Sequence, residues 1–94
     1  MKPRLLLRER RIVSEGRFAE MAIWKLPKPV PGSPHAFKYR LAFVVDGVCV
    51  LRFDNESGKG DHKHVGAQEV PYPFTSLTQL VTDFLDEIDK WSAP

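Results

Sequence analysis

The feature that most constrains the fold is a hairpin pattern in the middle of the chain. Apolar and polar residues alternate from Phe37 to Val45, the pair Asp46-Gly47 follows, and a second apolar run extends from Val48 to Phe53. A period of two indicates strands, and Asp-Gly is the dipeptide that tight two-residue hairpins favour because both positions need positive φ. The sequence therefore predicts an antiparallel sheet built around this hairpin.

The pairing of this hairpin predicts which side chains share a face. If the ladder continues without interruption from the turn, Tyr39 lies opposite Asp54. Leu41 then lies opposite Arg52 on the same face, whereas Arg40 lies on the other face. We therefore expect Tyr39, Arg52 and Asp54 to converge at the polar end of the hairpin.

A second hairpin is predicted closer to the N-terminus. Residues 5–13 and 17–25 both mix apolar and charged side chains in a strand-like pattern. A two-residue turn at Glu15-Gly16 places Arg11 opposite Glu20, so that opposite charges pair across the ladder. The next segment, residues 26–34, contains four of the eight prolines and is expected to be a stiff connection rather than an element.

The C-terminal part of the chain predicts one helix. Residues 61–65 are expected to form a short strand, and residues 66–73 to lead into the helix. Ser76 with Gln79 three residues later forms a capping-box pattern. Apolar residues then recur at helical spacing and predict the buried stripe: Leu77, Leu80, Val81, Phe84, Leu85, Ile88 and Trp91. A minority interpretation is that Trp91 contacts another chain.

Together these elements predict one α+β domain that spans residues 1–94. It has a mainly antiparallel sheet of four to five strands, from two hairpins plus a short strand, with the C-terminal helix packed on one face. The single cysteine, Cys49, lies in an apolar run and is expected to pack as a small hydrophobe. The first eleven residues carry too few apolar residues for a signal peptide or a membrane helix, so a cytoplasmic protein is expected.

Charge is distributed unevenly along the chain. Residues 1–64 hold 13 Lys or Arg and 7 Asp or Glu, a net +6, whereas residues 65–94 hold 1 and 5, a net −4. A basic front half could give the sheet a nucleic-acid-binding face, although two ordinary solvated surfaces would have the same composition.

The segment from Arg52 to His64 is the strongest candidate for chemistry. It brings His62, His64, basic residues and acids together around glycines. Two histidines can act as acid and base at neutral pH because both protonation states of imidazole are accessible there. On a strand, residues two apart share a face at about 6.6–7 Å, which suits the two sides of one phosphate.

The chain resembles the TumE family of bacterial toxin-antitoxin proteins. The resemblance lies in the run FKYRLAFVVDGVCVLRFDNESGKGDHKH, the preceding EMAIWKLPKPVPGSPHAFKYR and the Pro-Tyr-Pro-Phe that leads into the helix. It implies a toxin neutralised by a cognate helix-turn-helix antitoxin. By analogy with other small toxins, it also points to a ribonuclease.

A metal-independent ribonuclease would use these residues in distinct roles. His62 and His64 would be the acid and base, with no cofactor required. Arg52 would hold phosphoryl oxygens, and Asp54 or Asp61 would orient a histidine. Four residues are expected to contact the nucleic acid: Lys59, Lys63, Tyr39 and Arg40.

Three alternatives remain open at this stage. His-x-His with Asp54 or Asp61 also matches a single-metal site, although neighbouring lysines disfavour a cation. The chain could instead be a non-catalytic module that binds nucleic acid or protein through its basic sheet face. Open sheet edges would allow a homodimer. His35, beside Pro34, is expected to be an ordinary solvated histidine.

Overall fold

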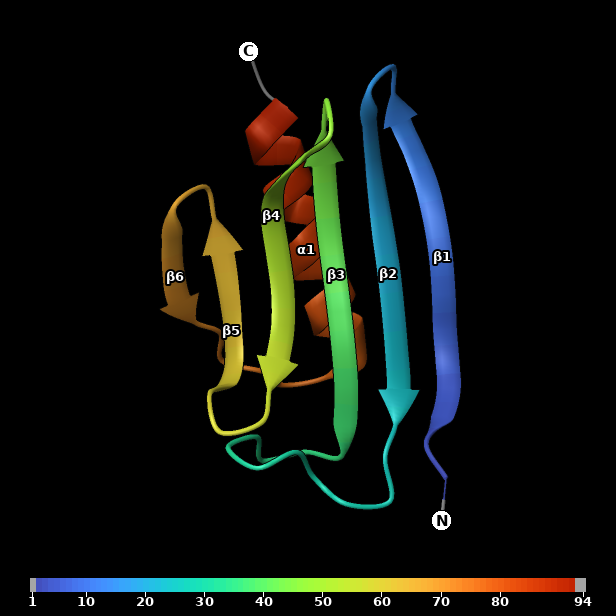
Figure 1. Cartoon of the computed structure of the whole chain (residues 1–94), viewed down its shortest axis with the longest axis vertical. Helices are drawn as coiled ribbons and strands as arrows, with labels where there is room; N and C mark the ends of the chain where they lie inside the picture. The colour runs from blue at the N-terminus through green and yellow to red at the C-terminus, as the bar shows by residue number, and fades with distance from the viewer. Residues whose placement is uncertain (1, 93–94) are drawn as a thin grey trace.

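The computed structural model describes residues 2–92 as one antiparallel sheet with one helix behind it (Figure 1). The strands follow one another across the sheet in chain order, so each pairs with its neighbour in sequence. Their bounds are β1 Arg4–Ser14, β2 Arg17–Lys25, β3 Phe37–Val45, β4 Val48–Glu56, β5 Gly60–Val65 and β6 Gln68–Pro71, and the helix is α1 Leu77–Ser92.

The predicted α+β class and the C-terminal helix are confirmed, but the strand count is wrong. The sheet has six strands rather than four to five. The additional strand is β6, because residues 68–71 turn back at Gly66 and pair with β5 before the chain reaches the helix. Gly66 has a φ of 60°, which the turn requires and glycine adopts at little cost.

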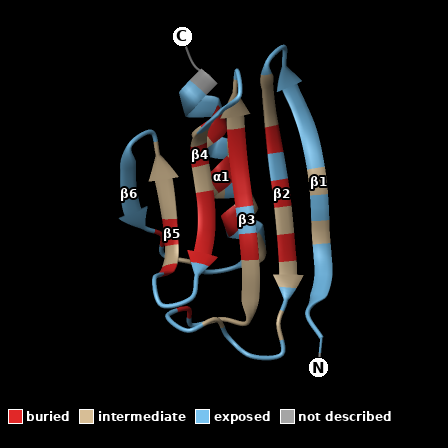
Figure 2. Cartoon of the chain, viewed as in Figure 1, coloured by how far each residue is buried: buried red, intermediate tan, exposed pale blue. Residues whose placement is uncertain are grey.

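The core lies between α1 and the middle of the sheet (Figure 2). The helix contributes Leu80, Phe84 and Ile88, and the ring of Phe84 meets that of Phe53 edge to face at 5.7 Å between centroids. Trp91 completes this side of the helix, with its ring 5.9 Å from that of Phe43. The predicted apolar stripe therefore packs against the sheet, although Trp91 at its end remains 39% exposed.

The helix begins as the capping pattern predicts, although only half of the capping box forms. The backbone N–H of Gln79 donates to Ser76 Oγ at 3.0 Å. The Gln79 side chain does not return to the backbone of Ser76 and instead donates to Asp83 Oδ1 at 2.7 Å. The cap thus satisfies one of the free N–H groups of the first turn.

No helix among residues 2–92 is long and apolar enough to cross a membrane.

Both predicted turns are confirmed, but both predicted registers are wrong by one residue. Ser14 pairs with Arg17 and Val45 with Val48, as the two-residue turns require. Close to each turn the ladder then skips one residue, at Val13 in the first hairpin. In the second hairpin the skipped residue is Val50. Each skip is a β-bulge, which shifts every later pair.

The bulge in the second hairpin changes which residues share a face. Asp54 pairs with Arg40 rather than Tyr39, and Arg52 pairs with Ala42 rather than Leu41. Because side chains alternate along a strand, Arg52 and Asp54 point away from the helix. Tyr39 faces the helix and is fully buried. The bulge in the first hairpin likewise places Arg10, not Arg11, opposite Glu20.

The sheet face that points away from α1, here called the open face, carries two adjacent rows of cross-strand neighbours. Both rows run from β1 to β6, perpendicular to the strands. The first row is Arg8, Ala22, Arg40, Asp54, His62 and Pro71, and the second row is Arg10, Glu20, Ala42, Arg52, His64 and Glu69.

The proline-rich connection between β2 and β3 is a loop, as predicted. In Figure 1 it passes below the ends of β3 and β4 to reach the turn between β4 and β5. There the N–H of Gly58 donates to the carbonyl of Pro31 at 2.8 Å. A Cβ on Gly60 would lie 2.7 Å from the carbonyl oxygen of Gly32, so glycine is needed for this close approach.

Candidate functional site

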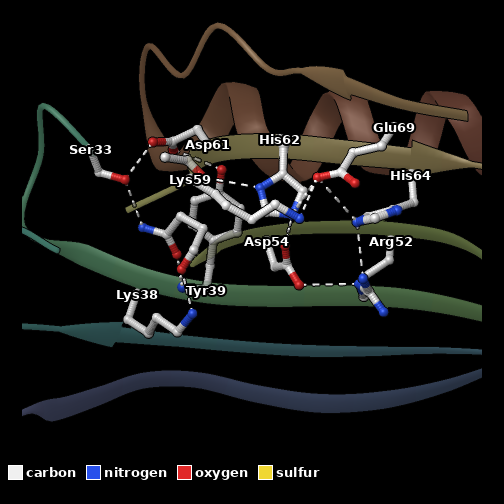
Figure 3. Close-up of polar contacts among 12 residues, drawn as sticks. Ser33, Lys38, Tyr39, Arg52, Asp54, Lys59, Asp61, His62, His64 and Glu69 are labelled. Atoms are coloured by element: carbon white, nitrogen blue, oxygen red, sulfur yellow. Dashed lines mark hydrogen bonds and ion pairs between the residues drawn. The ribbon is translucent and has the colours of Figure 1, made fainter. Parts of the chain in front are cut away.

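A cluster of charged and imidazole side chains lies on the open face where the two rows cross β4, β5 and β6. Arg52 and Asp54 come from β4, His62 and His64 from β5, and Glu69 from β6 (Figure 3). These residues are direct or diagonal neighbours in the ladder. Four of them were predicted site residues, and the structure brings those four together.

The four predicted residues form a continuous chain of contacts. His62 Nε2 lies 2.6 Å from Asp54 Oδ1. Asp54 Oδ2 lies 3.1 Å from Arg52 Nε, and Arg52 Nη2 lies 2.9 Å from His64 Nε2. The two imidazole rings are 5.1 Å apart between centroids. Arg52 therefore links the two histidines through the carboxylate.

The hydrogen-bond partners indicate where the protons lie. Arginine only donates, so the contact from Arg52 makes His64 Nε2 an acceptor and leaves His64 neutral with its proton on Nδ1. His62 Nδ1 lies 3.0 Å from the carbonyl oxygen of Gly60, which only accepts, so this nitrogen carries a proton. His62 Nε2, the other ring nitrogen, faces the carboxylate of Asp54.

The centre of the cluster is buried but poorly satisfied. The side chains of His62 and Asp54 are 5% and 8% exposed, whereas those of His64 and Arg52 are 26% and 29% exposed. The contacts of Arg52 Nε, Asp54 Oδ1 and His62 Nε2 are close, but they lack hydrogen-bond geometry. Buried polar atoms without well-directed partners are costly, and they are retained more often at functional sites than elsewhere.

Glu69 is a site residue that the sequence analysis missed. Its Oε1 lies 2.7 Å from Lys59 Nζ, 3.7 Å from His62 Nε2 and 3.9 Å from His64 Nε2. The hydrogen bond between Lys59 and Glu69 lowers the pKa of the Glu69 carboxyl group and raises the pKa of the Lys59 ammonium group. The missed signal was the sixth strand, which places residue 69 directly opposite His64.

Of the four residues predicted to contact nucleic acid, three have no contact with the cluster. Lys63 alternates to the helix face, where its Nζ lies 3.8 Å from Glu87 Oε1. Tyr39 is buried beneath the sheet on that same face. Arg40 is exposed on the open face, next to Asp54 in the first row. Lys59 alone of the four contacts the cluster.

In a second histidine and aspartate pair, His35 and Asp61, every side-chain nitrogen and oxygen has a hydrogen-bond partner. His35 Nε2 and the Tyr39 hydroxyl lie 2.6 and 2.8 Å from Asp61 Oδ2, and the Ser33 hydroxyl donates to Asp61 Oδ1 at 2.7 Å. The backbone N–H of Phe37 donates to His35 Nδ1 at 3.1 Å. Burial, followed by the hydrogen bond to Asp61, raises the pKa of Tyr39.

This second pair corrects two expectations. His35 is not a solvated histidine, because its side chain is only 10% exposed and its ring stacks on Phe74 at 3.8 Å between centroids. Asp61 does not orient either histidine of the cluster, because His35, Ser33 and Tyr39 occupy its carboxylate. Asp54 is the carboxylate in contact with His62.

Cys49 is exposed rather than buried among apolar side chains.

The cluster also offers donor atoms suited to a metal ion. One ligand atom each from Asp54, His62 and His64 can be chosen so that all three lie within 4.8 Å of one another. Two imidazoles and a carboxylate are ligands that zinc and other divalent transition metals accept. The guanidinium of Arg52 contacts two of these three residues, and its positive charge opposes a cation at the same place.

Comparison with known proteins identifies one family. The family model described as "Toxin TumE" matches residues 2–92, which is nearly the whole chain. The resemblance found in the sequence is thereby confirmed. No curated protein and no solved structure matches the chain.

Proposed function

The chain belongs to the TumE toxin family, and we propose that its toxic activity is metal-independent cleavage of RNA at the cluster on the open face. In this reaction the ribose 2′-oxygen attacks the adjacent phosphorus while the bond from phosphorus to the 5′-oxygen breaks. The products are a 2′,3′-cyclic phosphate and a free 5′-hydroxyl. The observation that carries the proposal is the contact chain that joins two imidazoles through Asp54 and Arg52.

His64 has the position and protonation state of the general base. Its Nε2 is an acceptor in the contact with Arg52, and its side chain is exposed enough to meet a substrate. When the Arg52 guanidinium turns to a phosphoryl oxygen, the lone pair of His64 Nε2 becomes free to take the 2′-hydroxyl proton. Arg52 then stabilises the charge that develops on the phosphoryl oxygens.

His62 is suited to be the general acid. As the general acid, His62 would carry a proton on both ring nitrogens, and the Asp54 carboxylate would balance the positive charge of that imidazolium. The nitrogen concerned, Nε2, is buried beneath Glu69 Oε1 at 3.7 Å. Proton transfer from His62 therefore requires Glu69 to move aside and the Asp54 carboxylate, 2.6 Å from the same nitrogen, to give way to the leaving oxygen.

The Glu69 carboxylate marks the position of the substrate phosphate. Its Oε1 is surrounded by Lys59 Nζ and both histidine Nε2 atoms, an environment that suits any anionic oxygen. A phosphodiester brings the same charge and can replace it. β6 is a short edge strand whose residues are all exposed, so moving Glu69 disturbs no core packing.

A toxin of this kind implies an antitoxin that neutralises it. We expect the partner to be a cognate helix-turn-helix protein encoded in the neighbouring reading frame. Such a partner would block cleavage most directly by covering the cluster, because His64 and Arg52 are reachable only from the open face.

The test is cleavage of a single-stranded RNA oligonucleotide by variants of the purified protein. His62→Gln and His64→Gln should each slow cleavage by about a hundred- to ten-thousand-fold, the usual contribution of one acid or base. Lys63→Ala is the matched control, because this residue lies between the two histidines but on the opposite face. A 2′-deoxy substitution at the scissile nucleotide should abolish cleavage. A double histidine variant that keeps full activity or toxicity would refute the proposal.

A second candidate, hydrolysis assisted by one divalent metal ion, has its own supporting observation. The donor atoms of Asp54, His62 and His64 lie close together and include two atoms that lack well-directed partners. Chelation distinguishes the two mechanisms. The metal-independent mechanism predicts an unchanged rate in excess EDTA, whereas the metal mechanism predicts loss of activity and recovery on adding zinc or manganese. The metal mechanism also predicts water attack, so that a 2′-deoxy substrate would still be cleaved.

A further inference from the structure

The open face has a groove at the end of the two rows that is remote from the cluster. Its volume is about 370 Å³, and it lies over β1, β2 and β3. Arg8, Arg10, Glu20, Ala22, Trp24 and Arg40 line it. The proposed chemistry uses none of these residues, so the groove needs an explanation of its own.

The groove is lined by two small side chains and by one aromatic side chain. Ala22 and Ala42 are small residues of the two rows, and they leave space between the longer side chains around them. Trp24 is half-buried, and the Arg8 guanidinium lies over its ring at 5.9 Å. An unpaired base can stack on the indole ring in place of the Arg8 guanidinium, which is then free to hold the neighbouring phosphate.

The charged side chains that line the groove are three arginines and two glutamates, Glu9 and Glu20, a net charge of +1. The Glu9 carboxylate pairs with Arg11 at 2.8 Å. Arg8 and Arg40 have no acidic partner within 4 Å among residues 2–92, and both are exposed. Arg10 makes only a loose contact with Glu20, at 3.8 Å. Two unpaired guanidinium groups that point to the same space favour an anionic ligand with several acceptor oxygens.

The ladder places this groove in line with the cluster. Arg40 pairs with Asp54, which contacts His62, and on its other side Arg40 pairs with Ala22 and then Arg8. Neighbouring strands are about 4.8 Å apart, so the first row spans about 19 Å from β5 to β1. An extended chain of several nucleotides fits along this distance.

We propose that the two rows form one binding path for single-stranded RNA, which crosses the sheet from the cluster to β1. This inference rests on the proposed ribonuclease activity and adds the form of its substrate. Phosphates bind Arg40 and Arg8, and a base stacks on Trp24. Single strands are favoured over duplexes because only an unpaired base can leave its neighbours and stack on a side chain. An acidic peptide would use the arginines but would have no use for the indole face.

Binding is tested with a fluorescent single-stranded RNA and the His64→Gln variant, which prevents cleavage. Adding Arg8→Gln and Arg40→Gln should reduce the salt dependence of binding, with the slope of log K against log salt falling in magnitude by about 1.4, or 0.7 for each lost phosphate contact. Trp24→Ala should weaken binding about tenfold. The matched control is Arg11→Gln, because Arg11 lies on the same strand but pairs with Ala19 on the helix side.

Two binding results would overturn the proposal. One is an equal loss of RNA affinity in Arg11→Gln and in the double arginine variant. The other is equally effective competition by polyglutamate and by RNA of the same length, which would identify the face as a surface for acidic proteins. Thermal melts of all the variants show whether any loss of binding comes from unfolding.

Cleavage separates a wrong path from a wrong reaction. In the protein with both histidines intact, Arg8→Gln with Arg40→Gln should raise KM severalfold for a long oligonucleotide and much less for a dinucleotide, which is too short to reach from the cluster to Arg8. If both substrates are cleaved as fast by this variant as by the parent protein, the path is wrong and the reaction stands. If the parent protein cleaves neither substrate, the reaction is wrong, and the binding measurements alone decide whether the path exists.

Discussion

The molecule contains two histidine and aspartate pairs with the same separation and opposite surroundings. His35 and Asp61 are 2.6 Å apart, as are His62 and Asp54. In the first pair every side-chain nitrogen and oxygen has a hydrogen-bond partner, and the further partners are Ser33, Tyr39 and the backbone of Phe37. In the second pair the two facing atoms lack hydrogen-bond geometry, and charged, partly exposed side chains surround them.

The difference separates a pair that holds the fold together from a pair whose polar atoms remain available for the proposed chemistry. Asp61 lies on β5 and holds the proline-rich loop against β3. Two of its donors, Ser33 and His35, come from the loop, and the third, Tyr39, comes from β3. Asp54 fixes nothing outside the open face, since its partners are the side chains of Arg52 and His62. Satisfied hydrogen bonds rigidify a fold, whereas buried groups without good partners retain the capacity to exchange protons or bind a ligand.

The largest expected effect is on activity, at the second pair. Asp54→Asn removes the negative charge beside His62 Nε2, so RNA cleavage should fall by about a hundredfold or more. The free energy of unfolding should change by only about 1 kcal/mol, because His62 can become neutral and Arg52 can reach water. Oligonucleotide cleavage and urea unfolding measure the two quantities. If activity and stability are lost in proportion, Asp54 is structural as well and the comparison fails.

The opposite outcome is expected at the first pair. Asp61→Asn weakens three hydrogen bonds to a charged acceptor, so the free energy of unfolding should fall by about 3 kcal/mol. Activity of the fraction that remains folded should be close to that of the parent protein. Urea denaturation gives the stability, and cleavage is normalised to the folded fraction. Loss of activity in fully folded protein would contradict the purely structural role of this pair.

The third prediction uses alkaline pH to sharpen the contrast, because Tyr39 belongs only to the first pair. Burial raises the pKa of Tyr39. Above about pH 10 the unfolded tyrosine loses its proton and the folded one keeps it, so the folded state binds more protons and stability falls as pH rises. The contribution is complete below pH 10 and is lost above it at up to about 1.4 kcal/mol per pH unit.

Tyr39→Phe should therefore reduce this slope while lowering stability at neutral pH through the lost hydrogen bond to Asp61. Urea unfolding at several pH values between 9 and 11 measures the slope for both proteins. Tyr72 has a raised pKa for the same first cause, burial, so some slope will remain. An unchanged slope in Tyr39→Phe would mean that Tyr39 is not held in its neutral form by the fold.

The smallest effect is expected at Glu69, on the exposed side of the second pair. If this carboxylate occupies the phosphate position, Glu69→Gln should strengthen binding of a non-cleavable RNA only severalfold, because Lys59 and both histidines are then free of a competing charge. Fluorescence titration at low salt measures the affinity. Glu56→Gln, at the end of β4, serves as the control for a general change in charge. Equal gains in both variants would remove the specific role of Glu69.

Local features of the fold were predictable because neighbouring residues determine them. The turns at Glu15-Gly16 and Asp46-Gly47 and the helix start after Ser76 follow from backbone preferences and a single side-chain cap. Of the site, the sequence supplied the two histidines on one face of a strand, since a period of two requires it. It also supplied Arg52 and Asp54 beside the histidines, although the β3 partners expected for these two residues were wrong.

What the sequence by itself determined is the first five strands, the helix and the residues capable of acid and base chemistry. The tertiary structure decided which of these residues meet. Val13 and Val50 are ordinary strand residues with no local sign of a bulge, yet those two positions decide which side chains reach the open face. His35 finds Asp61 twenty-six positions away, and Glu69 meets His64 only because β6 pairs with β5. Pairing across strands depends on the energy of the whole sheet, which no short segment contains.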